Sequence, residues 1–235
     1  MANDGFRETV EEHPDRFLAF AALPLQDPEA SASELERAVK ELGLKGGTMM
    51  TNVDGVPLDA EGLMPVYEKA VELDVPLFIH PTSPINSRAM GDYRLVPILG
   101  FGVDTTLSVL RLVFGGVLER LPELKLIASH FGGVYPYLRG RIETGFNAYP
   151  ECKIRISKPP STYLKRIWMD SIIYDSDIMM SAIAFSGAEK IVMGSDHPHQ
   201  IGDLANAVNR IEKLEISEDD KEKILWKNAK KLLKI

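Results

Sequence analysis

The sequence predicts a parallel α/β protein, and two observations carry this prediction. Short apolar runs alternate with amphipathic helical stretches along the whole chain of 235 residues. Several of these runs lack the polar/apolar alternation of a half-exposed strand, as expected for parallel strands that are covered on both faces. The predicted strands are residues 17–23, 45–51, 75–80, 125–130, 167–173 and 190–195.

The stretches between these strands have the apolar spacing of helices and carry start signals. Ser31 precedes Glu34 in a capping pattern, and Ser217 precedes Asp220 in another. The predicted helices are residues 31–42, 59–73, 105–121, 137–148, 176–185, 201–214 and 217–233. Strand alternating with helix is the pattern of a parallel α/β architecture.

Six β/α units and a closing helix fall two units short of a (β/α)8 barrel. No low-complexity linker or change in composition divides the chain, so we predict one domain over residues 1–235, an incomplete barrel of the TIM type. One connection, residues 81–103, is long and rich in Pro and Gly. We interpret it as a lid over the strand ends, with a surface excursion as the alternative.

Composition excludes several classes of function. A net charge of −7 argues against a general nucleic-acid surface, which needs clustered Lys and Arg. A single cysteine, Cys152, excludes an intrachain disulfide and suits a reducing compartment. We find no signal-peptide core and expect no apolar run near the ~20 residues of a membrane span. The prediction is a soluble, cytoplasmic protein that binds a small molecule, with no nucleic-acid or membrane partner.

The most informative pattern is the residue that each strand delivers at its carboxyl end. Three predicted strands lead to His80, to His130 and to Asp196. Gly132 and Gly133 follow His130 and leave room for a substrate beside the backbone. A single histidine at a strand end is more often a hydrogen-bonded structural group than a ligand. Three such ends on one rim of a barrel point instead to a site for Zn²⁺ or a similar divalent ion.

The other histidines carry weaker signals. His13 lies in a polar segment before the first strand, and we expect it on the surface. His197 and His199 flank Pro198 just after Asp196. A role for either one at the rim of the site, or behind the ligands, stays open.

Two arginines follow His130 by about two to three helical turns, Arg139 and Arg141. Solvated helix charges are the plain interpretation of both. Arg141 is the better candidate for pairing with a substrate carboxylate. Asp170 is placed in the middle of its predicted strand.

Four stretches of the sequence resemble the amidohydrolase-related, metal-dependent decarboxylases of the aminocarboxymuconate-semialdehyde decarboxylase type. They are HPDRFLAFAALPLQDPEASASELERAVKELGLKGG, PVYEKAVELDVPLFIHP, GGVLERLPELKLIASHFGGVYPYLRGRIETGF and KIVMGSDHPH. The resemblance implies a (β/α)8 barrel that holds one divalent metal, zinc or else manganese. It also implies non-oxidative removal of CO2 from a conjugated or aromatic carboxylate.

Site residues carry over from this resemblance position by position. His80 matches a metal ligand on the family's fifth strand, and Asp196 matches a metal ligand on the eighth. His130 matches the histidine that acts as acid and base on the metal-bound water, with Asp196 able to share the proton. Arg141 matches an arginine that holds a substrate carboxylate.

The sequence departs from the family at its amino-terminal end. Family members begin with a strand that carries a His-x-His pair of metal ligands, whereas the only His-x-His here is His197 and His199. The first two strands are therefore expected to be missing. A truncated product, strands supplied by another polypeptide and a naturally short barrel are the three explanations. Open sheet edges predict a homo-oligomer.

The function predicted on these grounds is decarboxylation, and two alternatives stay open. A metal-dependent hydrolase of a lactone, ester or amide needs the same metal, water and carboxylate-binding cation. A truncated, inactive barrel scaffold is the other, because His80 and Asp196 alone hold a metal poorly. Metal content and a comparison of CO2 release with lactone opening distinguish the three.

Overall fold

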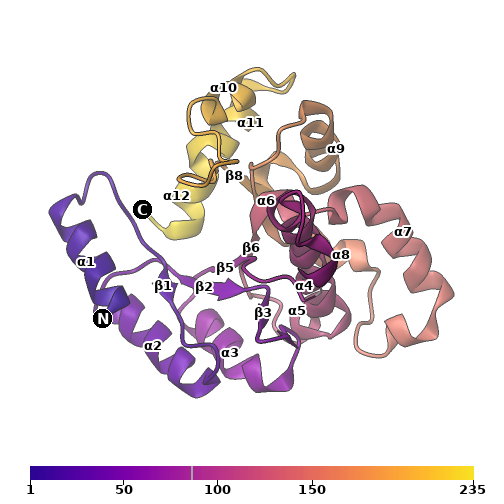
Figure 1. The fold of residues 1–235 in the computed structure, drawn as a ribbon, viewed down its shortest axis with the longest axis horizontal. Helices are drawn as coiled ribbons and strands as arrows, with labels where there is room; N and C mark the ends of the chain where they lie inside the picture. Colours follow the sequence, from indigo (N-terminus) through magenta and orange to yellow (C-terminus); the bar gives the residue numbers. More distant parts are fainter. Residues whose placement is uncertain (86) are drawn as a thin grey trace.

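The computed structural model describes residues 1–85 and 87–235, and a parallel sheet of six strands lies at its centre, in the order β1-β2-β5-β6-β7-β8. The strands are β1 (Ala21–Ala22), β2 (Gly47–Met50), β5 (Leu77–His80), β6 (Leu126–Ala128), β7 (Trp168–Asp170) and β8 (Ile191–Val192). The sheet curves and does not close, so that β1 and β8 lie at its two ends (Figure 1). The parallel α/β class and the partial TIM-type barrel are thus confirmed.

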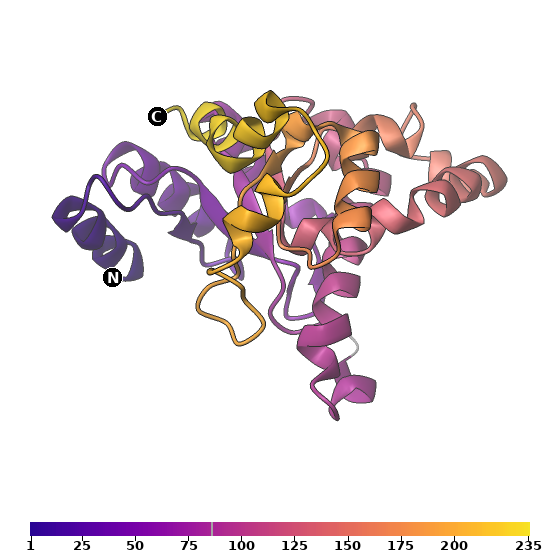
Figure 2. The same ribbon diagram turned by 90° about the horizontal axis from the view of Figure 1, so that it is seen from above.

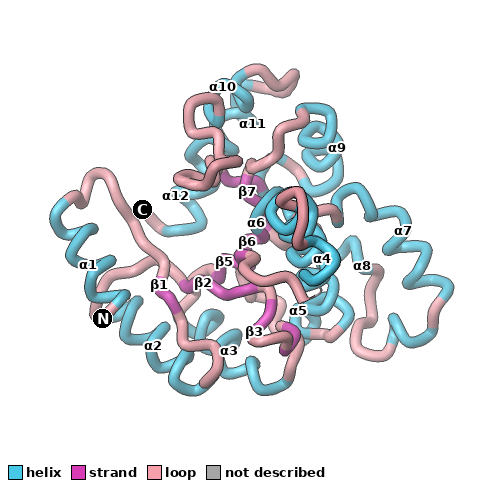
Figure 3. The backbone as a smooth tube through the Cα atoms, viewed as in Figure 1, coloured by secondary structure: helices cyan, strands magenta, loops and turns pink. Residues whose placement is uncertain are grey.

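Helices connect the strands, as the alternating pattern predicted. They are α1 (Ala2–Glu12), α2 (Pro28–Lys40), α3 (Met64–Glu72), α4 (Phe101–Phe114), α5 (Val117–Arg120), α6 (Ser129–Gly132), α7 (Tyr135–Ala148), α8 (Pro160–Leu164), α9 (Ser176–Ser186), α10 (Ala207–Glu212), α11 (Glu218–Glu222) and α12 (Asn228–Leu233). Helices α2, α3, α4 and α9 follow the outer side of the curved sheet, whereas the end of α12 lies toward its inner side (Figures 1 and 3).

The two faces of the sheet bury different side chains. On β5, Leu77 and Ile79 belong to the main core beneath the outer helices. Phe78, between them, packs with Ile127 of β6 and with Leu232 of α12 in a smaller inner cluster. Because alternate residues of a strand point to opposite faces, His80 shares the inner face with Phe78. The period of the strand thus decides that His80 faces away from the main core.

All six predicted strands are present, but each is shorter than predicted. The capping prediction for Ser31 was wrong, because α2 begins at Pro28 and the Asp27 side chain accepts a hydrogen bond from Ala30 N at 3.0 Å. Proline is favoured in the first helical turn, which explains the earlier start. The second cap is confirmed, since Ser217 Oγ accepts from Asp220 N at 3.1 Å.

Several elements were not predicted, among them the short helices α6 and α8. Helix α1 occupies the polar segment before the first strand, and β3 (Asn52–Val53) pairs with β4 (Val56–Pro57) in a short hairpin after β2. The predicted lid, residues 81–103, includes Asn86, which lies outside the described residues. Its described part contains a short 3-10 helix at Ser87–Met90 and a helical turn at Val96–Gly100 that continues into α4. Figure 2 shows the start of α4 projecting from the body on the same side as the loop after β8. A lid function of this segment stays a prediction.

The continuous helical run Val96–Phe114 corrects one expectation from the sequence. It has 19 residues with a mean hydropathy of 1.5, so by length and composition it is long and apolar enough to cross a membrane. Val109, Leu112 and Val113 are fully buried in the main core. Asp104 is buried as well and accepts hydrogen bonds from the Thr51 hydroxyl and the Asn52 amide. These contacts are those of a core helix of the domain.

Candidate active site

Strand β5 brings His80 to the inner face of the sheet at its carboxyl end. The side chain is half-buried, and burial lowers the pKa of the His80 imidazole below its usual 6.5, against the opposing influence of Asp196. A neutral imidazole is the form that binds a metal ion. Burial therefore favours the protonation state that a metal ligand needs.

His130 lies two residues beyond the last residue of β6, not at the end of the strand as predicted. Its backbone is left-handed, with φ 52° and ψ 49°, and Phe131 repeats this conformation with φ 56° and ψ 31°. The His130 ring lies 5.4 Å from the His80 ring, and His130 Nε2 lies 3.8 Å from Asp196 Oδ1. Burial lowers the pKa of His130, and the Asp196 carboxylate partly opposes this shift.

Asp196 also lies beyond its strand, four residues after β8 ends at Val192. Its backbone is left-handed as well, with φ 57°, and its carbonyl accepts a hydrogen bond from His199 N at 2.9 Å. This hydrogen bond folds the following residues back, so that the His199 ring stacks 6.3 Å from the His80 ring, at an angle of 16°. The turn after Asp196 brings His199 back over the site.

Ligand atoms of His80, Asp196 and His199 all lie within 4.8 Å of one another. Atoms that share one ion at ~2.1 Å are at most ~4.2 Å apart, so the three donors are close to the spacing that one ion needs. Two imidazoles and a carboxylate are a donor set that suits zinc or manganese. The set therefore fits a divalent metal. His197, on the other side of Pro198, is exposed and does not belong to it.

A cavity of about 440 Å³ opens beside these donors. Its polar lining consists of His80, Asp170, Ser195, Asp196, His197 and His199. Its other walls come from the inner cluster of the sheet and from α12, and they include Phe20, Phe78, Ile127, Val192 and Leu232. A volume of this size suits a small ligand that has one apolar body and one polar end.

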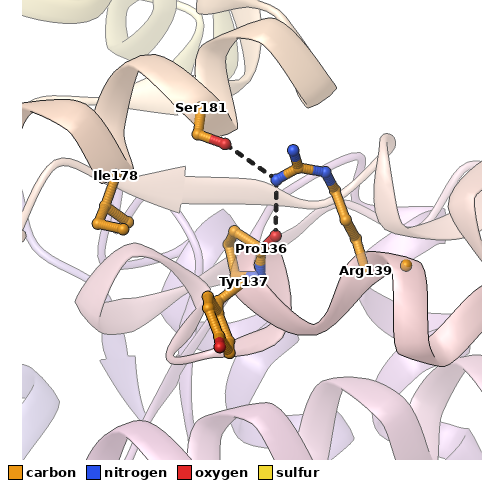
Figure 4. A pocket seen from close by; sticks show the side chains of 6 residues that line it. Pro136, Tyr137, Arg139, Ile178 and Ser181 are labelled. Atoms are coloured by element: carbon orange, nitrogen blue, oxygen red, sulfur yellow. Dashed lines mark hydrogen bonds between the residues drawn. The ribbon is translucent and has the colours of Figure 1, made fainter.

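The two arginines do not line this cavity among the described residues. Arg141 is exposed on α7, so its predicted contact with a substrate carboxylate stays a prediction. Arg139 lies in a separate pocket between α7 and α9 (Figure 4). Its guanidinium donates to Pro136 O at 2.9 Å and to Ser181 Oγ at 3.1 Å. Arg139 thus connects α7 to α9 through these hydrogen bonds.

Sequence reasoning missed the place of Asp170, which is the last residue of β7 and not in the middle of a strand. It is 4% exposed and lines the cavity, and burial raises its pKa to about 6. Its three hydrogen bonds all come from backbone N–H groups, those of His130, Phe131 and Ile172. The signal was in the sequence, since a carboxylate in an apolar strand needs buried partners. The expectation that His13 is on the surface is confirmed.

Comparison with known proteins agrees with this fold and this site. The sequence pattern of the amidohydrolase family, in the branch described as Amidohydro_2, matches residues 1–235. The chain belongs to the amidohydrolase family. This membership confirms the resemblance seen in the four sequence stretches.

Within this amidohydrolase family, the similar proteins named here are decarboxylases. The chain is 37% identical over 233 residues to 2-amino-3-carboxymuconate-6-semialdehyde decarboxylase of Dictyostelium discoideum, covering 98% of this chain and 65% of that protein. It is 36% identical to the gamma-resorcylate decarboxylase of a Polaromonas species, covering 100% of this chain and 75% of the relative. The chain thus spans about two thirds to three quarters of the length of these relatives.

Solved structures give the same result for the fold. The 5-carboxyvanillate decarboxylase of Sphingomonas paucimobilis superposes with a TM-score of 0.92 at 27% identity, covering 99% of this chain and 71% of that one. The dihydroxybenzoic acid decarboxylase of Polaromonas superposes with a TM-score of 0.87 at 33% identity, covering 99% and 74%, and that structure holds manganese and an inhibitor, 2-nitroresorcinol. A divalent metal is therefore a property of a close structural neighbour.

Proposed function

We propose that this amidohydrolase is a metal-dependent decarboxylase of a conjugated or aromatic carboxylate. The observation that carries the proposal is the position of His130, within 3.8 Å of Asp196, beside a cluster of metal donors that opens into an apolar cavity. The relatives named above, which are decarboxylases of such carboxylates, support the same reaction class.

His80, Asp196 and His199 would hold the metal. When bound, a divalent ion supplies positive charge that attracts the substrate carboxylate and stabilises negative charge as it develops. Zinc was the ion expected from the sequence. The manganese in the Polaromonas neighbour makes Mn²⁺ the first ion to test, with Zn²⁺ as the second.

His130 acts as the proton donor in this proposal. Its imidazolium gives a proton to the carbon that carries the carboxylate, and the bond from that carbon to the carboxylate then breaks. The electron pair of the broken bond restores the conjugated system, CO2 leaves, and the neutral imidazole takes a new proton from solvent. Burial makes the imidazolium a stronger acid, while Asp196 keeps protonation accessible, so that both influences serve the transfer.

The apolar walls of the cavity act on the body of the substrate. Phe78 and Ile127 present apolar faces below His80, and Leu232 of α12 packs against them. A planar conjugated body buries its surface against these residues while its carboxylate lies at the polar end. Water excluded from this space strengthens the interaction between the carboxylate and the cationic end.

The test is CO2 release by the protein loaded with Mn²⁺ or Zn²⁺. Gamma-resorcylate and 5-carboxyvanillate are the first substrates, and lactone opening is measured in parallel. Release of CO2 that is lost in His130→Gln supports the proposal. Lactone opening without CO2 release would favour the hydrolase, and protein that binds neither metal would favour the inactive scaffold.

We further propose that the protein is a homo-oligomer. Ile98 and Leu99, in the helical turn before α4, and Val103 and Leu107, in α4, are between 41% and 63% exposed. Exposed apolar side chains on one helix and strands at the two open ends of the sheet both favour association. Light scattering after size-exclusion chromatography tests it, and a monomer over a range of concentrations would contradict it.

A further inference from the structure

The Asp170 carboxylate receives hydrogen bonds from the turn that carries His130. Asp170 Oδ2 accepts from His130 N at 2.9 Å, and Oδ1 accepts from Phe131 N at 2.9 Å and from Ile172 N at 3.0 Å. Two successive left-handed residues direct their N–H groups toward one acceptor, and such a pair binds an anion. The carboxylate of β7 fills this position at the carboxyl end of β6.

The turn needs such a partner because its conformation is unfavourable. His130 and Phe131 both have positive φ, and neither is a glycine. Left-handed backbone is unfavourable for such residues, because the Cβ comes too close to the following carbonyl oxygen. Hydrogen bonds from N–H groups to a carboxylate are stronger than those between neutral groups, so the two bonds to Asp170 offset this cost and hold the turn.

The turn also decides which way His130 points. On β6, Leu126 and Ala128 face the main core, whereas Ile127 faces the inner cluster. In a continued strand, residue 130 would follow Leu126 and Ala128 toward the main core, because side chains alternate. The left-handed turn sends the His130 ring instead to the inner face, 5.4 Å from the His80 ring and 6.2 Å from the Phe101 ring, with which it is parallel within 8°.

We propose that Asp170 is a positioning residue, which aims His130 at the metal cluster by holding the left-handed turn at His130 and Phe131. Both of its carboxylate oxygens are engaged by backbone N–H groups, so its contribution to catalysis passes through His130. The effect on turnover rests on the proposed function, whereas the effect on the turn does not.

The first measurement needs no variant and no activity. In metal-free protein labelled with ¹⁵N and ¹³C, scalar couplings across the hydrogen bonds join the His130 and Phe131 nitrogens to the Asp170 carboxyl carbon. We expect both couplings, and nuclear Overhauser contacts between the His130 and Phe101 rings. Absence of both couplings in folded protein would overturn the proposal, whether or not the chain is a decarboxylase.

The second measurement compares Asp170→Asn with Asp104→Asn. Asp104 is also a buried carboxylate, but its partners are the Thr51 hydroxyl, the Asn52 amide and Ile85 N, and it accepts no hydrogen bond from the N–H groups of the turn. In Asp170→Asn we expect amide exchange at least about tenfold faster at His130 and Phe131 and loss of the His130–Phe101 ring contact. In Asp104→Asn both should stay as in the parent protein. If Asp170→Asn does not fold, Asp170→Glu replaces it, because it keeps the charge and displaces the turn.

Turnover of the metal-loaded protein completes the test. Asp170→Asn should lower kcat at least about tenfold with KM changed less than about twofold, since the metal donors and the apolar walls are unchanged and only the direction of the proton donor is altered. The positioning role would be overturned if Asp170→Asn showed faster amide exchange at His130 and Phe131 but kept the His130–Phe101 ring contact and the kcat of the parent protein. If the parent protein releases no CO2 from any carboxylate, the proposed function fails, and the couplings and ring contacts still decide the role of Asp170.

Discussion

His130 Nε2 lies 3.8 Å from Asp196 Oδ1, although the two residues come from turns after different strands. Each residue has a left-handed backbone, at φ 52° for His130 and φ 57° for Asp196. Both turns therefore direct a reactive side chain toward the same point at the carboxyl edge of the sheet. At this distance the His130 imidazole and the Asp196 carboxylate can share a proton during a reaction.

Replacing His130 should therefore remove turnover and leave the metal in place. We expect His130→Gln to lower kcat by about 10²–10⁴-fold, the range that a positioned acid or base contributes. Metal content should stay that of the parent protein, because His130 is not one of the clustered donors. His13→Gln is the matched control, since His13 is exposed and is distant in sequence from the residues of the site. Loss of metal together with activity would show that His130 is a ligand instead.

The two histidines beside Pro198 should differ in their effect on metal binding. His199 belongs to the donor cluster and His197 does not, although they are two residues apart. His199→Ala should weaken Mn²⁺ binding by at least about tenfold, because even an outer-shell partner of a metal ligand is worth about 10–100-fold. His197→Ala should change the Kd less than about twofold. Isothermal titration with Mn²⁺ measures both, and equal effects would remove His199 from the site.

The strands and the identity of the strand-end residues were predictable from the sequence, because apolar runs and their polar ends are local features. The direction in which those side chains point was not predictable from the sequence. His130 reaches the inner face through a left-handed turn that non-glycine residues rarely adopt, so no propensity at His130 or Phe131 predicts it. The turn depends on Asp170, 40 residues further along the chain.

The choice between His197 and His199 was equally beyond the sequence. Both flank the same proline, and only the hydrogen bond from His199 N to Asp196 O folds one of them back toward His80. For Arg141 the sequence suggested a role that the position of its side chain does not support. Its position in the motif suggested a substrate contact, whereas the helix that carries it leaves the side chain exposed. A motif fixes neighbours along the chain and leaves the direction of a helical side chain to the packing of the helix.

Acid should destabilise the metal-free protein through its site imidazoles. Burial lowers the pKa of both His80 and His130 below 6.5, the value for an exposed histidine. Below pH 6.5 the unfolded chain binds protons at these positions that the folded protein does not, so the free energy of unfolding falls as the pH falls through this window. Between pH 7.5 and 5.5, the drop in Tm should be smaller in the His80→Asn, His130→Asn double variant than in the parent protein. An equal drop would show that other groups carry the pH dependence.

Gly133, in the turn after His130, and Gly140, on helix α7, should respond to alanine in opposite directions. A Cβ on Gly133 would lie 2.1 Å from Gly102 O and 2.6 Å from Thr106 Oγ1, and the glycine has φ +69°. Gly133→Ala therefore combines a backbone clash with left-handed strain and should cost at least about 2 kcal/mol of unfolding free energy. Because α4 must then move away from the turn that holds His130, turnover should fall as well.

Gly140→Ala is the control on the adjoining helix α7. A Cβ on Gly140 would meet nothing within 4 Å, and its φ is not in the left-handed region. Alanine there should raise the stability by roughly 0.5–1 kcal/mol, because glycine inside a helix loses more backbone entropy on folding. Urea denaturation followed by circular dichroism measures both variants. Equal stability of the two would mean that α4 and the His130 turn are not in the close contact on which the site depends.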